Sequence, residues 1–311
     1  GRRENGVIPT VLSAEISACE HLEDMMLSAV RAASVVAATG CQVTVEAHIG
    51  LGLPGFTILG RPDDVCREAR DRVRAAIVTS GFYWPSRRIT LNLAPSTHKK
   101  VGSALDLAIA IALLISDEQL PAECAEGWAF IGELGLDGRV RAVSGVAPMV
   151  MALREDSHQR DDEDFSMPQL TPLRGVIVPN GNVSEALIAR PPALRVAQTL
   201  RQVAECLVGN IAWPEVNIHK ALDDLSEKIP DLSDVRGQTA ARLGLELSAS
   251  GGHHLLLVGP PGSGKTMLAK RLPSILPPMT MREALETTKI HSVAGKTKDV
   301  GLMAQRPFRS P

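Results

Sequence analysis

The sequence has no excess of charge of either sign. Its 33 Lys and Arg residues nearly balance 35 Asp and Glu residues, which leaves a formal net charge of -2 at pH 7. Proteins that bind DNA or RNA through their overall charge usually have a basic balance, so this class of nucleic-acid binder is excluded. Any nucleic-acid contact must therefore be local or must arise when several copies of the chain assemble.

A long hydrophobic run is also missing. The longest one, residues 104–115, contains Asp106 and is shorter than the roughly 18 residues that a membrane span requires. No secretory signal with an apolar segment precedes it, so export is not expected. We predict a soluble, globular, cytoplasmic protein with no membrane partner.

Cysteine is scarce, and its spacing excludes common metal and redox motifs. The five cysteines lie far apart and form no C-x-x-C pair; they are Cys19, Cys41, Cys66, Cys124 and Cys206. An odd number of widely spaced cysteines does not indicate a disulfide framework or a zinc site. We expect reduced thiols, most of them buried.

The two ends of the chain suggest a piece of a longer protein. The chain begins with Gly1 rather than Met and ends at Pro311 in a loop-like stretch. Residues 1–25 are polar and weakly patterned, and Met25 or Met26 could be the natural start. We expect residues 1–25 to be a disordered N-terminal extension.

Residues 26–208 have the mixed pattern of a compact α+β domain. With 311 residues, 44% of them hydrophobic, the chain can form about two domains of ordinary size. Alternating or clustered apolar residues predict strands, and apolar residues three or four apart predict helices. The predicted strands are 43–48, 88–93 and 175–179, with a hairpin at 130–134 and 138–140; the predicted helices are 63–80, 103–115, 146–154 and 200–208. Gly81 is expected to end the first of these helices.

Two stretches differ from this pattern. Residues 209–230, with Trp213-Pro214 in their first half, are predicted to be the interdomain linker, and a second domain covers 231–311. The acidic run 161–164 could bind a metal ion. Since like charges in a row repel each other and stay hydrated, a solvated loop is the favoured interpretation.

The strongest motif is a phosphate-binding loop in the second domain. It matches G-x-x-x-x-G-K-[ST] in full: Gly259, Pro260, Pro261, Gly262, Ser263, Gly264, Lys265 and Thr266. A strand is predicted at 254–258 before the loop, and a helix is predicted to start at Lys265. In such loops backbone N–H groups and the lysine hold the phosphates, and the Thr hydroxyl ligates Mg²⁺. The motif predicts binding of ATP with Mg²⁺.

The segment 231–238 stands about twenty residues before this loop and resembles the segment that precedes the P-loop of AAA+ ATPases. By that resemblance Val235 and Gly237 pack against adenine. Hydrolysis also requires an apolar strand that ends in Asp-Glu and an arginine from a neighbouring subunit, and nothing after Thr266 matches them. Asp117-Glu118 follows an apolar run, but in the first domain, where it is interpreted as a solvated helix end.

Taken in order, the motifs resemble the Mg-chelatase-like AAA+ ATPases of the YifB/ComM family, the competence-associated proteins. The likeness runs from about Met26 to Pro311. Its marks are GLPGF at 52–56, REARDRVRAAI at 67–77, LNLAP at 91–95, GSALDL at 102–107, GPPGSGKT at 259–266, RLP at 271–273, IHSVAG at 290–295 and RPFR at 306–309. The resemblance implies an ATP-binding protein that is truncated within its AAA+ domain. Full-length relatives are expected to be hexameric ATP hydrolases that remodel DNA by branch migration.

The first domain also resembles the proteolytic domain of Lon protease, through residues 100–104 and 132–140. In that register Ser103 falls at the nucleophile, and Ala147 occupies the lysine position. A serine hydroxyl without a neighbouring base is a poor nucleophile, so Ser103 is predicted to cap a helix and no peptidase activity is expected. The predicted fold is α/β: a Lon-protease-like (ribosomal protein S5 domain 2-like) α+β domain, then the start of a P-loop AAA+ domain.

Three functions stay open. The first is a DNA-remodelling motor, in which Arg87, Arg88, His98, Lys99 and Lys100 could meet phosphates, although a solvated basic loop is the favoured interpretation. The second is a chelatase-type subunit that inserts Mg²⁺ into a porphyrin, suggested by the likeness of the P-loop domain. The third is a nucleotide-binding fragment without turnover.

Two further patterns are interpreted as structural. Neighbouring residues of a strand point to opposite faces, so His253 and His254 of the predicted strand are not expected to share a metal ion. Thr280 and Glu283 have the spacing of a capping box, which predicts the start of a helix.

Overall fold

The computed structural model describes residues 27–155, 171–216, 230–296, 302–303 and 305–308. Three predictions fall wholly or partly elsewhere. The extension 1–25 and the acidic run 161–164 lie outside the described residues, as does the part 217–229 of the predicted linker.

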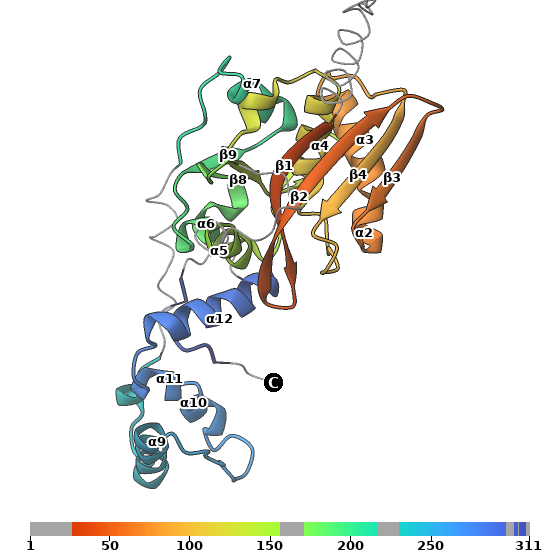
Figure 1. Cartoon of the computed structure of the whole chain (residues 1–311). Coiled ribbons are helices and arrows are strands. Elements are labelled where there is room, and N and C mark those ends of the chain that lie inside the picture. The colour runs from red at the N-terminus through yellow and green to blue at the C-terminus, as the bar shows by residue number, and fades with distance from the viewer. Residues whose placement is uncertain (1–26, 156–170, 217–229, 297–301, 304, 309–311) are drawn as a thin grey trace, which may run out of the picture.

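A seven-stranded sheet forms the centre of the first part of the chain (Figure 1). Its order is β3-β4-β2-β1-β5-β8-β9, and its strands are β1 Leu27–Val36, β2 Thr39–Gly50, β3 Gly55–Leu59, β4 Arg88–Ala94, β5 Trp128–Phe130, β8 Gly175–Pro179 and β9 Leu194–Ala197. The β1–β2 and β2–β4 pairs are antiparallel, and the other neighbours are parallel. A mostly parallel central sheet agrees with the predicted α/β class.

Strand β1 is absent from the sequence prediction, and its burial explains why. Six of its ten residues are buried, because β1 lies in the middle of the sheet between β2 and β5. Val30 and Ala32 belong to one hydrophobic cluster, while Ala33 belongs to another. A strand that is covered on both faces has no polar alternation for a sequence pattern to detect.

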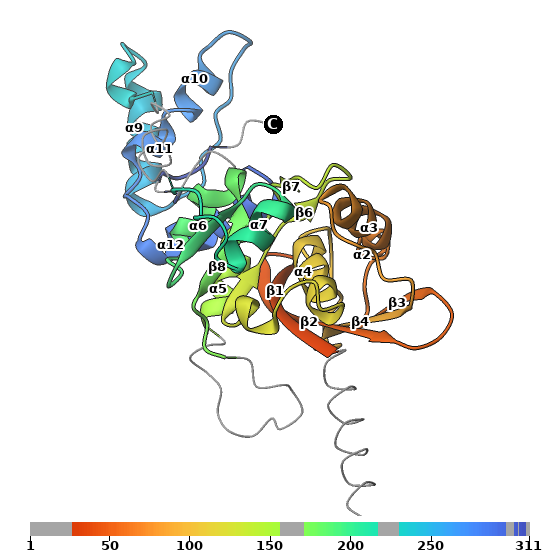
Figure 2. The ribbon, with the colours of Figure 1, turned by 90° about the horizontal axis from the view of Figure 1, so that it is seen from above.

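Helices cover both faces of the sheet. On one face α3 Ala69–Thr79, α4 Asp106–Ser116 and α7 Leu200–Leu207 lie together (Figure 2). On the other face α5 Val146–Glu155 packs against β1 and β2, and α6 Val183–Ile188 packs against β8 and β9. In β8 the side chains alternate between the two clusters, since Ile177 joins the first and its neighbours Val176 and Val178 join the second.

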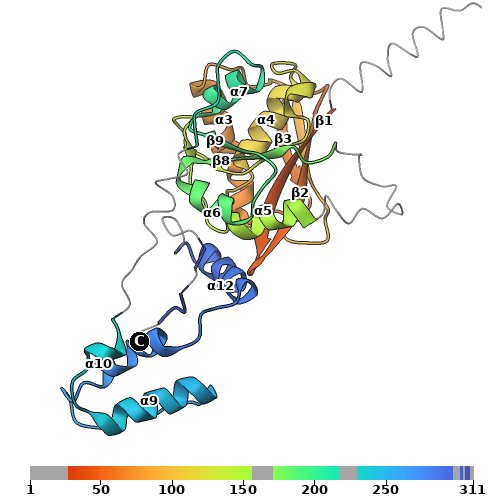
Figure 3. The same ribbon diagram turned by 90° about the vertical axis from the view of Figure 1, so that its left-hand side faces the viewer.

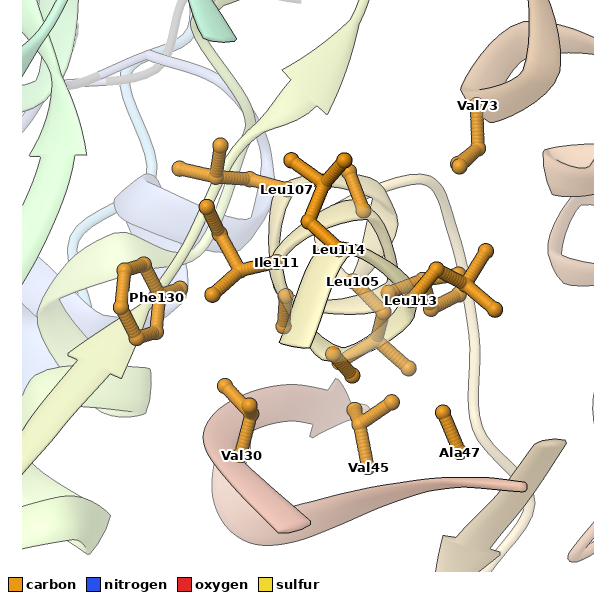
Figure 4. Packing of buried hydrophobic residues seen from close by; sticks show 14 of the residues in the cluster. Val30, Val45, Ala47, Val73, Leu105, Leu107, Ile111, Leu113, Leu114 and Phe130 are labelled. Atoms are coloured by element: carbon orange, nitrogen blue, oxygen red, sulfur yellow. The ribbon is translucent and has the colours of Figure 1, made fainter. Parts of the chain in front are cut away.

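Helix α4 is the centre of the larger cluster. All eleven of its residues are buried. Its Ile111 points toward Phe130, and its Leu114 points away from Val30 and Val45 (Figure 4). A helix that is apolar on every side is stable in water only inside a core. The hydrophobic run of the sequence is therefore an interior helix, and among the helices of the described ranges none has the length and apolar character that a membrane crossing requires.

The predicted helix 63–80 is interrupted near its start. Asp63 caps a short helix, α2 Asp64–Arg67, by accepting a hydrogen bond from the N–H of Cys66, and α3 follows. The end of α3 confirms the prediction for Gly81, which has φ +84°. The N–H of Phe82 donates to Ile77 O and that of Gly81 to Val78 O, which is the Schellman arrangement that leaves a glycine in the left-handed region.

The remaining predicted elements of the first part are close to those observed. The predicted strands 43–48 and 88–93 lie inside β2 and β4, and the predicted helices 146–154 and 200–208 correspond to α5 and α7. The hairpin consists of β6 Glu133–Leu134 and β7 Val140–Arg141, and residues 128–130 join the large sheet instead. Short 3-10 turns η1 Ala122–Ala125 and η2 Asn180–Asn182 complete this part.

The start of α4 corrects one prediction. Ser103 is not a helix cap, because α4 begins at Asp106 with Leu105 as its N-cap residue. The hydroxyl of Ser103 donates instead to the carboxylate of Glu133. The end of the helix agrees with expectation, since Asp117 is its C-cap residue and Glu118 is exposed.

The second part of the chain is helical. It contains the 3-10 turn η3 Leu232–Asp234 and helices α9 Thr239–Gly251, α10 Lys265–Ala269, α11 Leu272–Ile275 and α12 Met281–Val293. Helices α9, α10 and α11 lie away from the sheet, and α12 lies beside α5 (Figure 3). Thr280 and Glu283 form the predicted capping box at the start of α12.

The predicted strand 254–258 is wrong. These residues have no regular structure, and Leu256 and Val258 are 84% and 86% exposed. A central strand is stable only when neighbouring strands pair with its N–H and C=O groups, and no strand of the described ranges lies beside this segment. The local apolar pattern predicts a strand, but its partners decide whether the strand forms.

The described cysteines agree with the prediction of reduced thiols. Cys66, Cys124 and Cys206 are free thiols; Cys66 and Cys206 are buried, whereas Cys41 and Cys124 are half-buried. Burial raises the pKa of the Cys66 thiol to about 12 and that of Cys124 to about 11. Cys19 lies outside the described residues.

Candidate nucleotide-binding site

The glycine-rich loop 259–264 leads directly into α10, as the motif predicts. Gly262 has φ +79° and Gly264 has φ +84°, and Gly264 is the N-cap residue of α10. Both values lie in the left-handed region, where a side chain is strained. A Cβ at Gly262 would have no atom within 4 Å, so at this residue the glycine is required by the turn and the space beside it is open.

Lys265 is the residue that closes the loop. Its ammonium group donates to Gly259 O at 2.9 Å, to Pro260 O at 2.8 Å and to the hydroxyl of Ser263 at 3.3 Å. The loop therefore surrounds the positive charge with its own carbonyl and hydroxyl oxygens. An anion that entered the loop would compete with these oxygens for the ammonium, and the charge makes a phosphate a stronger partner than a carbonyl.

Thr266 lies in the first turn of α10 with its side chain exposed. A hydroxyl in this place can ligate a metal ion together with phosphate oxygens. Pro261 and Ser263 are also exposed, so the whole loop is open to solvent. Among the residues that the structure describes, no group of three or more His, Cys, Asp or Glu side chains is placed to hold a metal ion.

The segment 231–238 is brought next to the loop. Val235 is buried with Leu232, Leu245 and Leu268, and the last of these belongs to α10. Gly237 is exposed with φ +73°. The side chain of Val235 thus helps to hold α10 in place; a contact of Val235 and Gly237 with adenine stays a prediction.

Gln238 contacts the glycine-rich loop, and sequence analysis did not predict this contact. It has φ +50°, an uncommon value for a residue with a side chain, and it is the N-cap residue of α9. Its side-chain N–H group donates to Ser263 O at 3.4 Å. The only signal in the sequence is its position directly after Gly237, within the segment that resembles AAA+ ATPases.

The structure separates the basic residues that were considered for DNA contact. Arg87, Arg88, His98 and Lys99 are exposed. Lys100 is only 2% exposed, and its ammonium donates to the carbonyl oxygens of Pro95 and His98. Lys100 therefore cannot meet a phosphate in this conformation, and that part of the prediction is wrong.

The residues at the register of the Lon dyad are not arranged as a nucleophile and a base. Ser103 is bonded to Glu133, as described above. Ala147 is buried in α5, and its N–H donates to the carboxylate of Glu185 at 3.2 Å. The absence of peptidase activity stays a prediction.

A buried ion pair stands beside Ser103, at the start of α4. Asp106 is fully buried, and Arg72 of α3 donates to both of its carboxylate oxygens, at 2.7 Å and 3.1 Å. Burial raises the pKa of Asp106 to about 6, although the hydrogen bonds and the charge of Arg72 act in the opposite direction. Such a pair fixes α3 against α4 more than it adds to net stability.

Comparisons with known proteins agree with the order of the two parts. A family model described as "Subunit ChlI of Mg-chelatase" matches residues 45–161, and one described as "Magnesium chelatase, subunit ChlI" matches residues 231–311. The loop 259–266 and the 231–238 segment both lie within the second match.

Three relatives show how far the similarity extends. An uncharacterised protein of Mycobacterium tuberculosis is 42% identical over 270 residues, which are 86% of this chain and 50% of the relative. The protein YifB of Escherichia coli is 39% identical over 289 residues, 92% of this chain and 53% of the relative. The competence protein ComM of Haemophilus influenzae is 38% identical over 272 residues, which are 86% of this chain and 50% of the relative. The chain spans about half the length of the curated relatives it matches.

Proposed function

Because the chain belongs to the magnesium-chelatase ChlI family, as a member similar to YifB and ComM, we propose that it binds ATP with Mg²⁺ at residues 259–266. The observation that carries the proposal is the place of Lys265. Its ammonium lies inside a turn held open by two left-handed glycines, where only neutral oxygens of the loop oppose its charge. A triphosphate would supply the negative charge that this loop lacks.

Each residue of the loop has a role in this proposal. The N–H groups of the turn and Lys265 bind the phosphates, and the hydroxyl of Thr266 ligates Mg²⁺. Mg²⁺, when bound, neutralises phosphate charge. Val235 and Gly237 are proposed to border the adenine, and Gln238 is proposed to hold Ser263 O so that the turn keeps its shape.

Replacement of Lys265 by Ala tests the proposal. We expect isothermal titration calorimetry to detect binding of Mg-ATP to the unchanged protein and none to Lys265→Ala, because the variant keeps the turn but loses its charge. Lys270→Ala is the matched control, since Lys270 is exposed at the C-terminal end of the same helix. Unchanged affinity in Lys265→Ala would show that the nucleotide site has been assigned wrongly.

For the full-length protein we propose an ATP-driven DNA-remodelling motor, acting in the cytoplasm as a homo-hexamer. Support comes from the resemblance to the YifB/ComM family and from the printed name of the Haemophilus relative, a competence protein. Within this proposal the division of the chain is 26–208 for a Lon-protease-like domain, 209–230 for the linker and 231–311 for the start of the AAA+ domain. A branched-DNA displacement assay with the intact protein tests it, and ATP hydrolysis without strand displacement would contradict the motor.

A chelatase-type subunit is the second candidate function, favoured by the descriptions of both family models. The similarity to YifB and to ComM, however, covers 92% and 86% of this chain and therefore extends over both of its parts. We therefore expect no insertion of Mg²⁺ into a porphyrin when the intact protein is added to an assay that contains the other chelatase subunits. Insertion that depends on Lys265 would reverse the order of the two candidates.

A further inference from the structure

The C-terminal end of α12 is buried against the first part of the chain. Ser292 is only 1% exposed, and its backbone carbonyl accepts a hydrogen bond of 3.1 Å from the N–H of Gly145, the residue before α5. Gly145 has φ +84°, and a Cβ there would lie 2.9 Å from the side chain of Val35. The contact therefore joins α12 to a tight turn that only glycine fits.

A buried carboxylate completes this contact. Glu185 of α6 is 1% exposed, and it accepts hydrogen bonds from the N–H of Ala147 at 3.2 Å, from the amide group of Asn182 at 3.0 Å and from the hydroxyl of Ser292. All three donors are neutral. A buried carboxylate is costly unless donors surround it, so the hydroxyl that α12 contributes has more weight than an ordinary surface hydrogen bond.

Helix α12 follows α10 and α11 in the chain after the short connection 276–280. The residues between α11 and α12 include Pro277 and Pro278, whose rings fix φ and leave the connection little freedom. The guanidinium of Arg306 donates to Pro277 O at 3.0 Å. On the other side Leu268 of α10 and Leu272 of α11 share one hydrophobic cluster. Among the described residues, α10 and α12 are thus linked through α11 and the connection 276–280.

We propose that Glu185 and Ser292 form a latch between α12 and the sheet domain, and that this latch reports occupancy of the nucleotide loop to the sheet domain. We call Glu185, Ser292, Asn182 and the N–H groups of Gly145 and Ala147 the α12 latch. The latch itself depends only on the contacts given above. Its response to nucleotide rests on the proposed function.

Hydrogen exchange without nucleotide tests the latch. Ser292→Ala removes the donor, and Glu185→Gln keeps the shape of the acceptor but removes its charge. Since a hydrogen bond to a charged group is stronger than one between neutral groups, we expect exchange of the amides at 290–294 to be about 10-fold or more faster in either variant. Glu286→Gln is the matched control, because Glu286 lies on α12 in an exposed pair with Arg282 at 3.1 Å.

The first experiment compares the exchange rates of the same α12 amides, 290–294, between the latch variants and the control variant. Circular dichroism establishes that each variant is folded. If Ser292→Ala does not fold, Glu185→Gln alone tests the latch. Faster exchange in the latch variants but not in Glu286→Gln supports the latch. Equal exchange in all four proteins would overturn it.

A second experiment tests the response of the latch to nucleotide. Hydrogen exchange is measured with and without Mg-ATP, and calorimetry measures the binding of Mg-ATP in parallel. We expect exchange at 290–294 in the unchanged protein to differ by about 5-fold or more between the free and the bound state, and this difference to disappear in the latch variants. Binding without such a difference would overturn the response and leave the proposed function standing. Absence of binding would refute the proposed function and the response together, and the latch would still be judged on the exchange without nucleotide.

Discussion

At the scale of single residues, burial decides which charged groups can act. Lys265 and Lys100 are both bonded to backbone carbonyls, yet Lys265 lies in an open loop and Lys100 in a closed one. Burial lowers the pKa of Lys100, whereas Lys265 is the lysine that we propose exchanges its loop oxygens for a phosphate. Two lysines with the same kind of partner thus differ in their access to a ligand.

The Arg72–Asp106 pair gives a prediction for pH dependence. The pKa of Asp106 is about 6 in the fold against 3.8 for the free group, so between these values the folded protein binds more protons than the unfolded chain. The contribution of Asp106 to the free energy of unfolding is therefore fully present below pH 3.8, the pKa of the free group. It is lost as the pH rises through about 6, the pKa in the fold, with a slope of at most about 1.4 kcal/mol per pH unit.

Urea unfolding at several pH values measures this slope. All three tryptophans, Trp84, Trp128 and Trp213, pack against the first hydrophobic cluster of the sheet domain, so their fluorescence follows that domain. We expect the slope between the two pKa values to be smaller in Asp106→Asn, which cannot titrate. An identical pH profile for the two proteins would show that Asp106 titrates normally.

At the scale of elements, short-range signals define helix ends well. The capping box of α12 and the Schellman end of α3 each depend on residues within one turn of the helix. Sequence patterns contain all the information that such ends require. The start of α4 is different, because Ser103 finds its partner Glu133 thirty residues away.

Replacement of Gly81 by Ala should weaken the end of α3. The left-handed φ of +84° is costly for a residue with a Cβ, so we expect a loss of about 1–2 kcal/mol in the free energy of unfolding, measured by urea denaturation. Gly55→Ala is the control, since Gly55 has an ordinary φ and its nearest new contact would be at 3.8 Å. Equal losses in both variants would argue against backbone strain as the cause.

At the scale of the whole molecule, the two parts differ in how much they bury. The sheet domain has two large clusters, whereas the cluster found among the described residues of the second part has four buried members, Leu232, Val235, Leu245 and Leu268. Apolar burial is the main source of stability. The second part should consequently be the less stable of the two, with α12 as its connection to the first.

This difference predicts unfolding in two steps. In urea we expect circular dichroism to report an early loss of helix, and tryptophan fluorescence to change only at higher concentration, because all three tryptophans pack against the first hydrophobic cluster of the sheet domain. Mg-ATP should stabilise the first step alone, by about 2.7 kcal/mol at a concentration 100 times Kd. A single transition seen equally by both probes would contradict this description.

Residues close together in the chain were sufficient to predict the glycine-rich loop that leads into α10 at Lys265, the capping box and most helices, because each of these depends on local sequence. Tertiary structure alone decided that β1 is a buried central strand, that residues 254–258 form no strand, and that Lys100 and Glu185 are enclosed. Strand pairing and burial depend on partners far away in the sequence, such as Ser292 for Glu185. No local pattern contains those partners, and only the folded chain brings them together.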